Sequence, residues 1–245
     1  MSMYAGQSAT GRGPLILGHR GASGEHPENT MQAFTAARDA GADGIEFDVR
    51  SSADEVLVVH HDAHLADGRL LRDVHSSDLP TSIPTLGEAL LGTAGLFLNI
   101  EIKNSPREAG HDPDHGMSVA IAGLIAGMEA HARTIVSSFE LESVLPIRSI
   151  DPTISLAWLT WGQADPATLI GRAADHGLQA INPHDRQVDR AFVERAHGKG
   201  LGVYVWTVDS VERARELADY GVDGIITNDP RSLIDGLAGR AGPRS

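Results

Sequence analysis

The sequence predicts a single (β/α)8 barrel of parallel strands, with an extra β-hairpin strand at the C-terminal mouth of the barrel. Three observations lead to this prediction: short apolar runs alternate with helical patterns, nine such runs are present, and two of them are too close for a helical crossover. The chain has 245 residues, and a barrel of this kind takes roughly 250. No composition shift marks a second domain, so we expect one domain over 14–238, with a flexible N-terminal segment (1–13) and a flexible tail (239–245).

The expected strands are short runs rich in Val, Ile and Leu, as in parallel sheets that are covered on both faces. In chain order they are Leu15–Gly18, Gly44–Val49, Val56–His60, Leu96–Ile102, Thr134–Ser138, Ile154–Leu159, Ala180–Asn182, Gly202–Val208 and Gly224–Thr227. Only the six residues RSSADE separate the second run from the third, whereas a parallel crossover takes about a dozen residues or more. These two runs therefore form the hairpin, and eight strands remain for the barrel.

Helical patterns fill most of the connections. In NTMQAFTAARDAG, the side chains of Met31, Phe34 and Ala37 recur at helical spacing. The segments DRAFVERAHGKG and SVERARELADYG show further helical patterns. Gly41 and Gly221 end the first and last of these segments and suit the position that terminates a helix.

Composition and charge narrow the classes of function. The chain contains no cysteine, which excludes disulfides, thiolate metal sites and cysteine nucleophiles. Its net charge of −13 disfavours nucleic acid and anionic membrane surfaces as partners. No apolar run is long enough for a transmembrane helix, and none resembling a secretory signal precedes the first strand. We therefore expect a cytoplasmic protein that acts on a small molecule, with no prediction of its oligomeric state.

Charged side chains interrupt two of the apolar runs. Glu46 and Asp48 are two residues apart, so both point to one side of their strand, and Glu101 and Lys103 repeat this spacing on the neighbouring barrel strand. Catalytic and binding residues in such barrels lie at the C-terminal ends of the strands. Three carboxylates converging there need a positive charge among them, and oxygen ligands without sulfur favour Mg²⁺ or Ca²⁺. A salt-bridge cluster with Lys103 and Arg20 is the alternative, and the spacing leaves both open.

Two histidines follow strands that end at the same mouth. His19 precedes Arg20 in GHRGAS, and His61 ends the hairpin strand. Histidines on opposite sides of a cation can serve as general base and general acid near neutral pH. Arg20 and Lys103 suit an oxyanion of the substrate. His60 lies next to His61, but strand alternation sends it to the opposite face.

Two other groups of polar residues are weaker candidates for a functional site. HDPDH at 111–115 has the composition of a metal cluster, yet it lies in a Pro-broken segment before a helix, which favours a solvated loop. His184 and Asp185 follow a short strand and could line the rim of the barrel.

Seven ordered blocks resemble the glycerophosphodiester phosphodiesterase family and span nearly the whole chain from Leu15 to Pro230. They are GHRGASGEHPENTMQAF, GADGIEFDV, VLVVHHD, IPTLGEAL, LNIEIK, VYVWTVD and GVDGIITNDP. The resemblance implies a TIM barrel that hydrolyses glycerophosphodiesters, such as glycerophosphocholine or glycerophosphoethanolamine, to sn-glycerol 3-phosphate and an alcohol. It makes His19 and His61 the acid–base pair. The sequence leaves open which of them is the base, and our own hypothesis is His19 as base and His61 as acid.

The same resemblance implies the binding residues. It assigns one divalent cation, Mg²⁺ or Ca²⁺, to Glu46, Asp48 and Glu101. Arg20 and Lys103 would contact the phosphoryl group, and Trp206 would line the part of the site that binds the glycerol moiety. Asn228 departs from the aspartate that is commoner in the family, which could alter a contact at the rim. Only residues 63–100 separate the HD and IEIK motifs, so small loops would select the alcohol.

Other functions remain as alternatives. The closest is a lysophospholipase D-type activity on lysolipids, and another is a barrel that binds phosphodiesters without cleaving them. An aldolase would use Lys103 for a Schiff base but leaves the histidines without roles. A two-carboxylate glycosidase would lack the aromatic platform of a sugar site, since the chain has only three Trp, three Tyr and five Phe.

Overall fold

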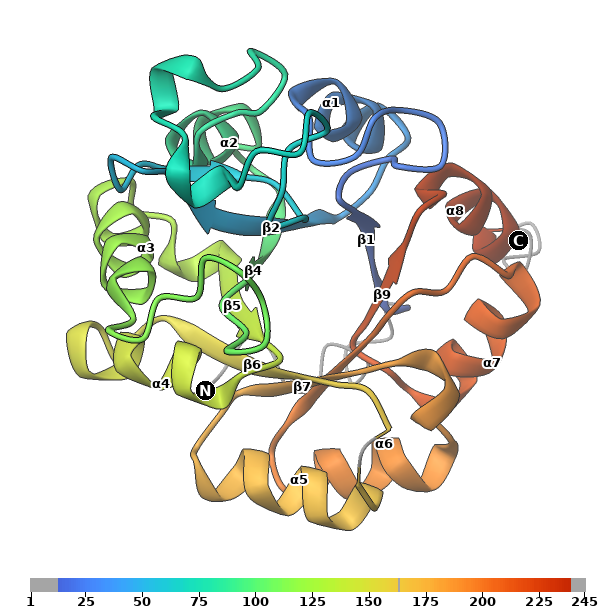
Figure 1. Cartoon of the computed structure of the whole chain (residues 1–245). Helices are drawn as coiled ribbons and strands as arrows, with labels where there is room; N and C mark the ends of the chain where they lie inside the picture. The colour runs from blue at the N-terminus through green and yellow to red at the C-terminus, as the bar shows by residue number, and fades with distance from the viewer. Residues whose placement is uncertain (1–12, 163, 239–245) are drawn as a thin grey trace.

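The computed structural model describes residues 13–162 and 164–238. Within them, nine strands form one sheet, and eight of these close into a parallel barrel (Figure 1). The strands are β1 (Leu15–His19), β2 (Gly44–Ser51), β3 (Leu57–Val59), β4 (Phe97–Ile102), β5 (Thr134–Ser138), β6 (Ser155–Thr160), β7 (Ala180–Pro183), β8 (Gly202–Val205) and β9 (Gly224–Thr227). Residues 1–12 and 239–245 lie outside the described residues, so the predicted flexible ends stay predictions.

Strand pairing closes the barrel and places the extra strand. β1 pairs in parallel with both β2 and β9, which completes the ring. β3 pairs antiparallel with the C-terminal end of β2, where Val49 lies opposite Val59 and Ser51 opposite Leu57. The predicted (β/α)8 barrel with a hairpin strand at its C-terminal mouth is therefore confirmed.

Helices occupy the connections and surround the ring of strands (Figure 1). In the described residues they are α1 (Met31–Asp39), α2 (Leu86–Gly92), α3 (Gly116–Gly127), α4 (Leu141–Ile150), α5 (Pro166–Asp175), α6 (Arg190–His197), α7 (Val211–Tyr220) and α8 (Pro230–Ala238). The Thr30 side chain caps α1 by accepting from the Ala33 amide. Gly221 ends α7 with a left-handed φ of 87° that glycine adopts without strain. None of the helices in the described ranges is long and apolar enough to cross a bilayer.

Strand alternation separates the helix-facing core from the barrel interior. On β2, Ile45, Phe47 and Val49 belong to the large core between strands and helices, whereas Glu46 and Asp48 point the other way. The barrel interior contains a smaller apolar cluster below the mouth, formed by Leu17, Ile135, Ala157, Ala180, Tyr204 and Ile226. Glu46 and Asp48 therefore share the barrel interior with this apolar cluster.

The observed strand ends differ from the predicted ones at β8. The sequence predicts a strand to Val208, but β8 ends at Val205, and Trp206 makes only an isolated parallel bridge with His184. The Trp206 indole nitrogen donates to the carbonyl oxygen of Asn182 at 2.9 Å. Trp206 thus ends up in the loop at the mouth of the barrel, with its ring anchored to β7.

Candidate active site

A cavity of about 240 Å³ opens at the C-terminal ends of the barrel strands. The charged part of its lining is formed by His19, Arg20, Glu46, His61, Glu101 and Lys103. Its apolar part is formed by Phe139, Leu159, Trp161, Trp206 and Ile226. Every site residue predicted from the sequence lines this cavity except Asp48, which is fully buried.

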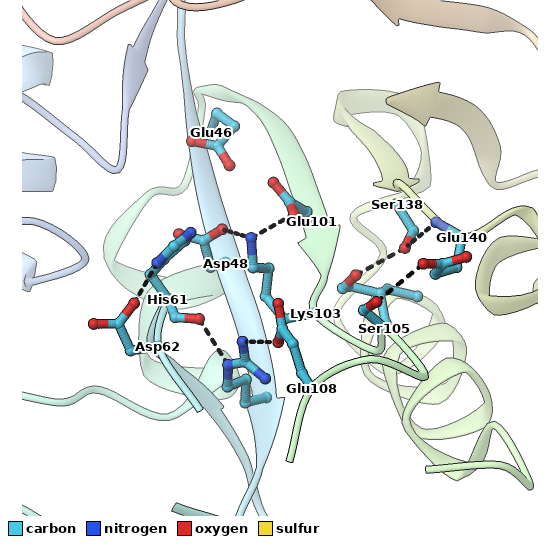
Figure 2. A network of polar contacts seen from close by, with 12 residues as sticks. Glu46, Asp48, His61, Asp62, Glu101, Lys103, Ser105, Glu108, Ser138 and Glu140 are labelled. Atoms are coloured by element: carbon cyan, nitrogen blue, oxygen red, sulfur yellow. Dashed lines mark hydrogen bonds and ion pairs between the residues drawn. The ribbon is translucent and has the colours of Figure 1, made fainter. Parts of the chain in front are cut away.

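Three buried carboxylates converge at the base of the charged part. Register places Asp48 of β2 beside Glu101 of β4, and Glu46 lies one inward position earlier on β2 (Figure 2). Each of the three residues offers a carboxylate oxygen, and these oxygens all lie within 4.8 Å of one another. In the described ranges this is the only group of acidic or histidine side chains that could hold a metal ion.

Two cationic side chains enter the same cluster. Lys103 Nζ lies 2.8 Å from Glu101 Oε1 and 3.6 Å from Asp48 Oδ1 (Figure 2). Arg20 Nε lies 3.1 Å from Asp48 Oδ2. The Asn29 amide donates to the same Asp48 oxygen at 2.8 Å. Although burial opposes ionisation, Lys103, Arg20, His61 and Asn29 together hold the pKa of Asp48 below its usual value.

Glu46 is left without a comparable partner. Its Oε2 accepts from the Arg20 main-chain amide at 3.1 Å, but its buried Oε1 accepts no hydrogen bond. Burial, followed by repulsion from Asp48 and Glu101, raises its pKa well above the usual value. Burial also raises the pKa of Glu101, which reaches about 7 although Lys103 opposes the shift.

A divalent cation fits this donor set. Arg20 and Lys103 supply the salt bridges that the sequence offered as the alternative, yet they leave Glu46 Oε1 and Asp48 Oδ1 buried without a hydrogen bond. Hard carboxylate oxygens around a compact space are what Mg²⁺ and Ca²⁺ bind. The salt bridges and a divalent-cation site are therefore compatible, because Arg20 and Lys103 pair with Asp48 and Glu101 but leave these two oxygens without a hydrogen bond.

His19 ends β1 and faces the carboxylates. Its Nδ1 lies 2.7 Å from Asn228 Oδ1, and its Nε2 lies 3.9 Å from Glu46 Oε2. The side chain is 18% exposed. Burial, followed by the nearby Arg20 guanidinium, lowers the pKa of His19. The neutral imidazole is therefore its dominant form at neutral pH.

His61 approaches the same carboxylates from the loop after β3. Its Nδ1 lies 2.7 Å from Asp62 Oδ1 (Figure 2). The His61 side chain is 32% exposed, so it is more accessible than His19. Its main-chain oxygen accepts from Arg50 Nε at 2.7 Å, which anchors the loop to β2. His60 does not line the mouth cavity, and its Nε2 lies 3.4 Å from the His64 carbonyl oxygen instead.

The backbone around Arg20 is shaped for this site. Arg20 adopts a left-handed φ of 58°, which is uncommon for a residue with a side chain. A Cβ at Gly18 would lie 2.7 Å from the Gly21 carbonyl oxygen, so only glycine permits this turn. The guanidinium Nη1 binds both carboxylate oxygens of Glu28 at 2.9 Å. Arg20 is thus held between a buried and an exposed carboxylate at the edge of the cavity.

Aromatic rings form the opposite wall. The Trp206 ring makes an edge-to-face contact with Phe139 at 5.4 Å between centroids, and it lies 5.3 Å from Trp161. His184 packs on both tryptophans, at 4.3 Å from Trp161 and 5.1 Å from Trp206. His184 was expected to line the rim, but it does not line the cavity and instead packs against the two tryptophans that do. Asp185 also does not line the cavity, and it forms an ion pair with Arg213 of α7 at 2.6 Å.

The 111–115 segment does not form a metal cluster. Within the described chain it is an irregular loop, in which Asp112 Oδ2 accepts from the Met117 amide in the first turn of α3. The Asp112 carbonyl oxygen also accepts from the Asn104 amide at 2.9 Å. The prediction of a loop is confirmed, and Asp112 helps to start the helix.

Sequence reasoning missed two polar residues of the site. Asn99 lines the cavity one inward position before Glu101, and its buried amide makes no hydrogen bond. Its place in LFLNIEI, on the same face as Glu101, is the signal that could have found it. Asn228 was expected to alter only a rim contact, but it binds His19 directly. No pattern along the chain reveals this contact, since 209 positions separate the two residues.

The protonation state of Lys103 decides between an aldolase-type and a hydrolase-type barrel. Despite burial, Glu101 and Asp48 raise its pKa, so it is a protonated partner of carboxylates and a poor Schiff-base nucleophile. Two histidines and two cations around buried carboxylates suit acid–base chemistry on an anionic ester. The fold and the cavity are therefore those of a TIM-barrel hydrolase.

Comparison with known proteins identifies the family. Residues 19–232 match the model of the glycerophosphoryl diester phosphodiesterase family, and the chain belongs to this family. Its enzyme class is that of the glycerophosphodiester phosphodiesterases.

Individual relatives match over nearly their whole length. The glycerophosphodiester phosphodiesterase of Caldanaerobacter subterraneus subsp. tengcongensis is 31% identical over 242 residues, which cover 90% of this chain and 96% of that protein. A Mycobacterium tuberculosis protein named probable glycerophosphodiester phosphodiesterase 2 is 32% identical over 260 residues, with coverages of 93% and 92%. The crystal structure of a glycerophosphodiester phosphodiesterase from Thermotoga maritima has a TM-score of 0.78 at 25% identity and covers 91% of this chain and 98% of that one.

Proposed function

We propose that this chain hydrolyses small glycerophosphodiesters, such as glycerophosphocholine and glycerophosphoethanolamine, to sn-glycerol 3-phosphate and the free alcohol. The observation that carries the proposal is the cluster of Glu46, Asp48 and Glu101, which lies between two histidines at one cavity. Family membership supports the reaction class. The structure of an Oleispira antarctica phosphodiesterase with the product sn-glycerol 3-phosphate shares the fold, with a TM-score of 0.79 at 21% identity.

In this proposal the three carboxylates hold one divalent cation, Mg²⁺ or Ca²⁺. When bound, the cation polarises the phosphoryl oxygens and stabilises the charge that develops on them. The buried Oε1 of Glu46 and Oδ1 of Asp48, which accept no hydrogen bond, support this assignment. Arg20 and Lys103 border the same cavity and bind the remaining phosphoryl oxygens as fixed positive charges.

His19 acts as the general base and His61 as the general acid. Burial lowers the pKa of His19, so its neutral Nε2 can take the proton from the nucleophile, which is either water or the glycerol 2-hydroxyl. Water gives sn-glycerol 3-phosphate directly, whereas the 2-hydroxyl gives a cyclic phosphodiester that a water molecule opens to sn-glycerol 3-phosphate in a second step. As the bond from phosphorus to the alcohol oxygen breaks, His61 gives a proton to that oxygen. Asp62 orients the His61 ring by accepting from Nδ1, which leaves Nε2 for the proton transfer.

Trp206 provides the wall for the glycerol carbon atoms. Its ring is fixed by the hydrogen bond to Asn182 and by the edge contact with Phe139. A rigid aromatic surface opposite the charged groups positions glycerol C–H bonds without hydrogen bonds of its own. Its contribution is therefore expected in substrate binding.

The assay that tests the proposal is release of sn-glycerol 3-phosphate from both substrates after treatment with EDTA and after adding back Mg²⁺ or Ca²⁺. Metal-dependent release supports the proposal and identifies the ion. Release from lysophosphatidylcholine alone would favour the lysophospholipase D-type alternative. Binding of glycerophosphocholine without release under any ion would favour the non-catalytic barrel. The cytoplasmic location and the absence of nucleic-acid partners stay predictions of the sequence.

A further inference from the structure

The geometry points to Asp209 and Asn228 as a relay that fixes which ring nitrogen of His19 carries the proton. Asp209 follows β8 and Asn228 follows β9, so both lie at the mouth of the barrel, and β1 with His19 stands between β9 and β2. Both are positioning residues, because they act on the reaction through His19. The inference rests on the proposed function only in naming His19 as the base.

The relay begins with the orientation of the Asn228 amide. Its Nδ2 donates to Asp209 Oδ2 at 2.8 Å, and its Oδ1 faces His19 Nδ1 at 2.7 Å. Ser23 Oγ donates to the same Oδ1 at 2.9 Å. A carboxylate only accepts hydrogen bonds, so the NH₂ group of Asn228 must face Asp209 and the oxygen must face His19.

The tautomer of His19 follows from that orientation. An amide oxygen only accepts, so His19 must donate to it from a protonated Nδ1. In the neutral ring, Nε2 then carries the lone pair. This is the nitrogen on the Glu46 side, 3.9 Å from Glu46 Oε2. The relay thereby leaves the base nitrogen free at the end of the ring that faces the carboxylates.

Asp209 cannot turn to undo this arrangement. Its Oδ1 accepts from the Asn228 main-chain amide at 2.8 Å and from Thr227 Oγ1 at 2.9 Å. One carboxylate oxygen is thus committed to the β9 backbone and the other to the Asn228 side chain. The acceptor pattern of Asp209, set by the end of β9, is transmitted through one amide to a histidine on β1.

An isosteric change at position 209 should reverse the relay. In Asp209→Asn, the side-chain oxygen is still required by the Asn228 main-chain amide, so the new NH₂ group faces the Asn228 side chain. Asn228 then turns its oxygen toward position 209 and presents NH₂ to His19. His19 must accept at Nδ1 and carry its proton on Nε2, which removes the lone pair from the base position.

The exchanged pair should restore the original pattern. In the double variant Asn228→Asp with Asp209→Asn, the carboxylate at 228 accepts from His19 and from the NH₂ group at 209. The oxygen of Asn at 209 still accepts from the β9 backbone. The Asn228→Asp single variant also keeps an acceptor toward His19, although it places two carboxyl groups face to face.

The test combines ¹⁵N NMR of the histidine rings at about pH 8, where an ordinary histidine is neutral, with steady-state hydrolysis of glycerophosphocholine. We expect the wild type, Asn228→Asp and the double variant to carry the His19 proton on Nδ1, and Asp209→Asn to carry it on Nε2. In another enzyme a wrong histidine tautomer lowers kcat by about 10⁴-fold. We expect at least about a tenfold loss of kcat in Asp209→Asn with KM little changed, and recovery in the double variant.

Ser23→Ala is the matched control, because it removes a donor to the same Asn228 oxygen without changing which atom faces His19. It should keep the tautomer and kcat within about twofold. An Nδ1 proton in folded Asp209→Asn, or a double variant no faster than Asp209→Asn, would overturn the relay. If the wild type hydrolyses no phosphodiester but Asp209→Asn still switches the tautomer, the relay stands and the proposed function fails.

Discussion

The early and the late strands of the barrel line the same cavity with opposite chemistry. β2 and β4 bring the carboxylates and Lys103 to the mouth (Figure 2). Arg20 follows β1 at the same mouth, whereas Leu159 of β6 and Ile226 of β9 line the cavity with hydrocarbon. Both groups occupy inward positions near the ends of parallel strands. The fold therefore tolerates either chemistry there, and among the described residues the proposed catalytic groups lie on the side of the early strands.

The early and late strands also differ in the free energy that burial of their side chains costs. Carboxylates that are buried together disfavour their own ionisation, which is why the pKa values of Glu46 and Glu101 are raised. The late strands bury apolar side chains in the same layer at no such penalty. Asn228 is the exception, since it belongs to the late strands and yet supports His19. We conclude that substitutions in the early strands will act on turnover and stability, and those in the late strands mainly on binding.

The largest effect is expected at Glu46. Glu46→Ala removes the carboxylate whose Oε1 accepts no hydrogen bond, and we expect turnover to fall more than about 10³-fold because the candidate cation loses a ligand. The measurement is kcat for glycerophosphocholine, with circular dichroism to show that the barrel is folded. Glu194→Ala on the exposed face of α6 is the matched control and should be fully active. Retained turnover in Glu46→Ala would break the assignment of catalysis to the early strands.

The next prediction separates the two histidines. His19→Ala and His61→Ala should each lower turnover of glycerophosphocholine by about 10² to 10⁴-fold, as for other general acids and bases. With a p-nitrophenyl ester of glycerol phosphate, the leaving group needs no proton. We then expect activity to recover in His61→Ala but to stay low in His19→Ala. The reverse pattern would exchange the roles of base and acid.

A third prediction concerns the pH dependence of stability in EDTA. The pKa of Glu101 is about 7 in the folded protein against an ordinary 4.5, so the folded state binds its proton more tightly than the unfolded state does. This stabilisation is complete below about pH 4.5 and is lost as the pH rises through about 7. A shift of 7 − 4.5 = 2.5 pH units corresponds to about 3 kcal/mol.

Urea unfolding of the wild type and Glu101→Gln between about pH 5 and pH 8 measures this effect, since glutamine keeps the shape without the titration. We expect the free energy of unfolding of the wild type to fall relative to the variant as the pH rises. Adding Mg²⁺ or Ca²⁺ should flatten the difference, because a bound cation favours the ionised carboxylate. Parallel curves in EDTA would show that the early strands carry no such penalty.

The smallest effect is expected in the late strands. Trp206→Ala removes a partly buried aromatic ring of the cavity lining. We expect KM to rise about tenfold, which equals about 1.4 kcal/mol, while kcat changes less than about threefold. Trp161→Ala is the comparison within the same aromatic group. Its side chain is half exposed, so its effect on KM should be smaller. A large loss of kcat in Trp206→Ala would mean that the apolar wall also positions the reacting groups.

Much of this architecture could be read along the chain. The nine apolar runs correspond to the nine strands, and the short RSSADE segment marks the hairpin because backbone geometry forbids a crossover of that length. Period-two spacing was sufficient to place Glu46 with Asp48 and Glu101 with Lys103 on inward faces. These are local rules, so the sequence alone was enough to apply them.

Contacts between distant segments required the folded chain. The sequence determined that carboxylates, cations and histidines gather at one mouth, because residues that follow parallel strands meet at the same end of a barrel. It did not determine that Lys103 and Arg20 pair with Asp48, whereas the buried Glu46 is repelled by Asp48 and Glu101. Nor did it reveal that Asn228 holds His19. Such pairings depend on barrel closure and side-chain direction, which bring β9 beside β1 and have no signature in local spacing.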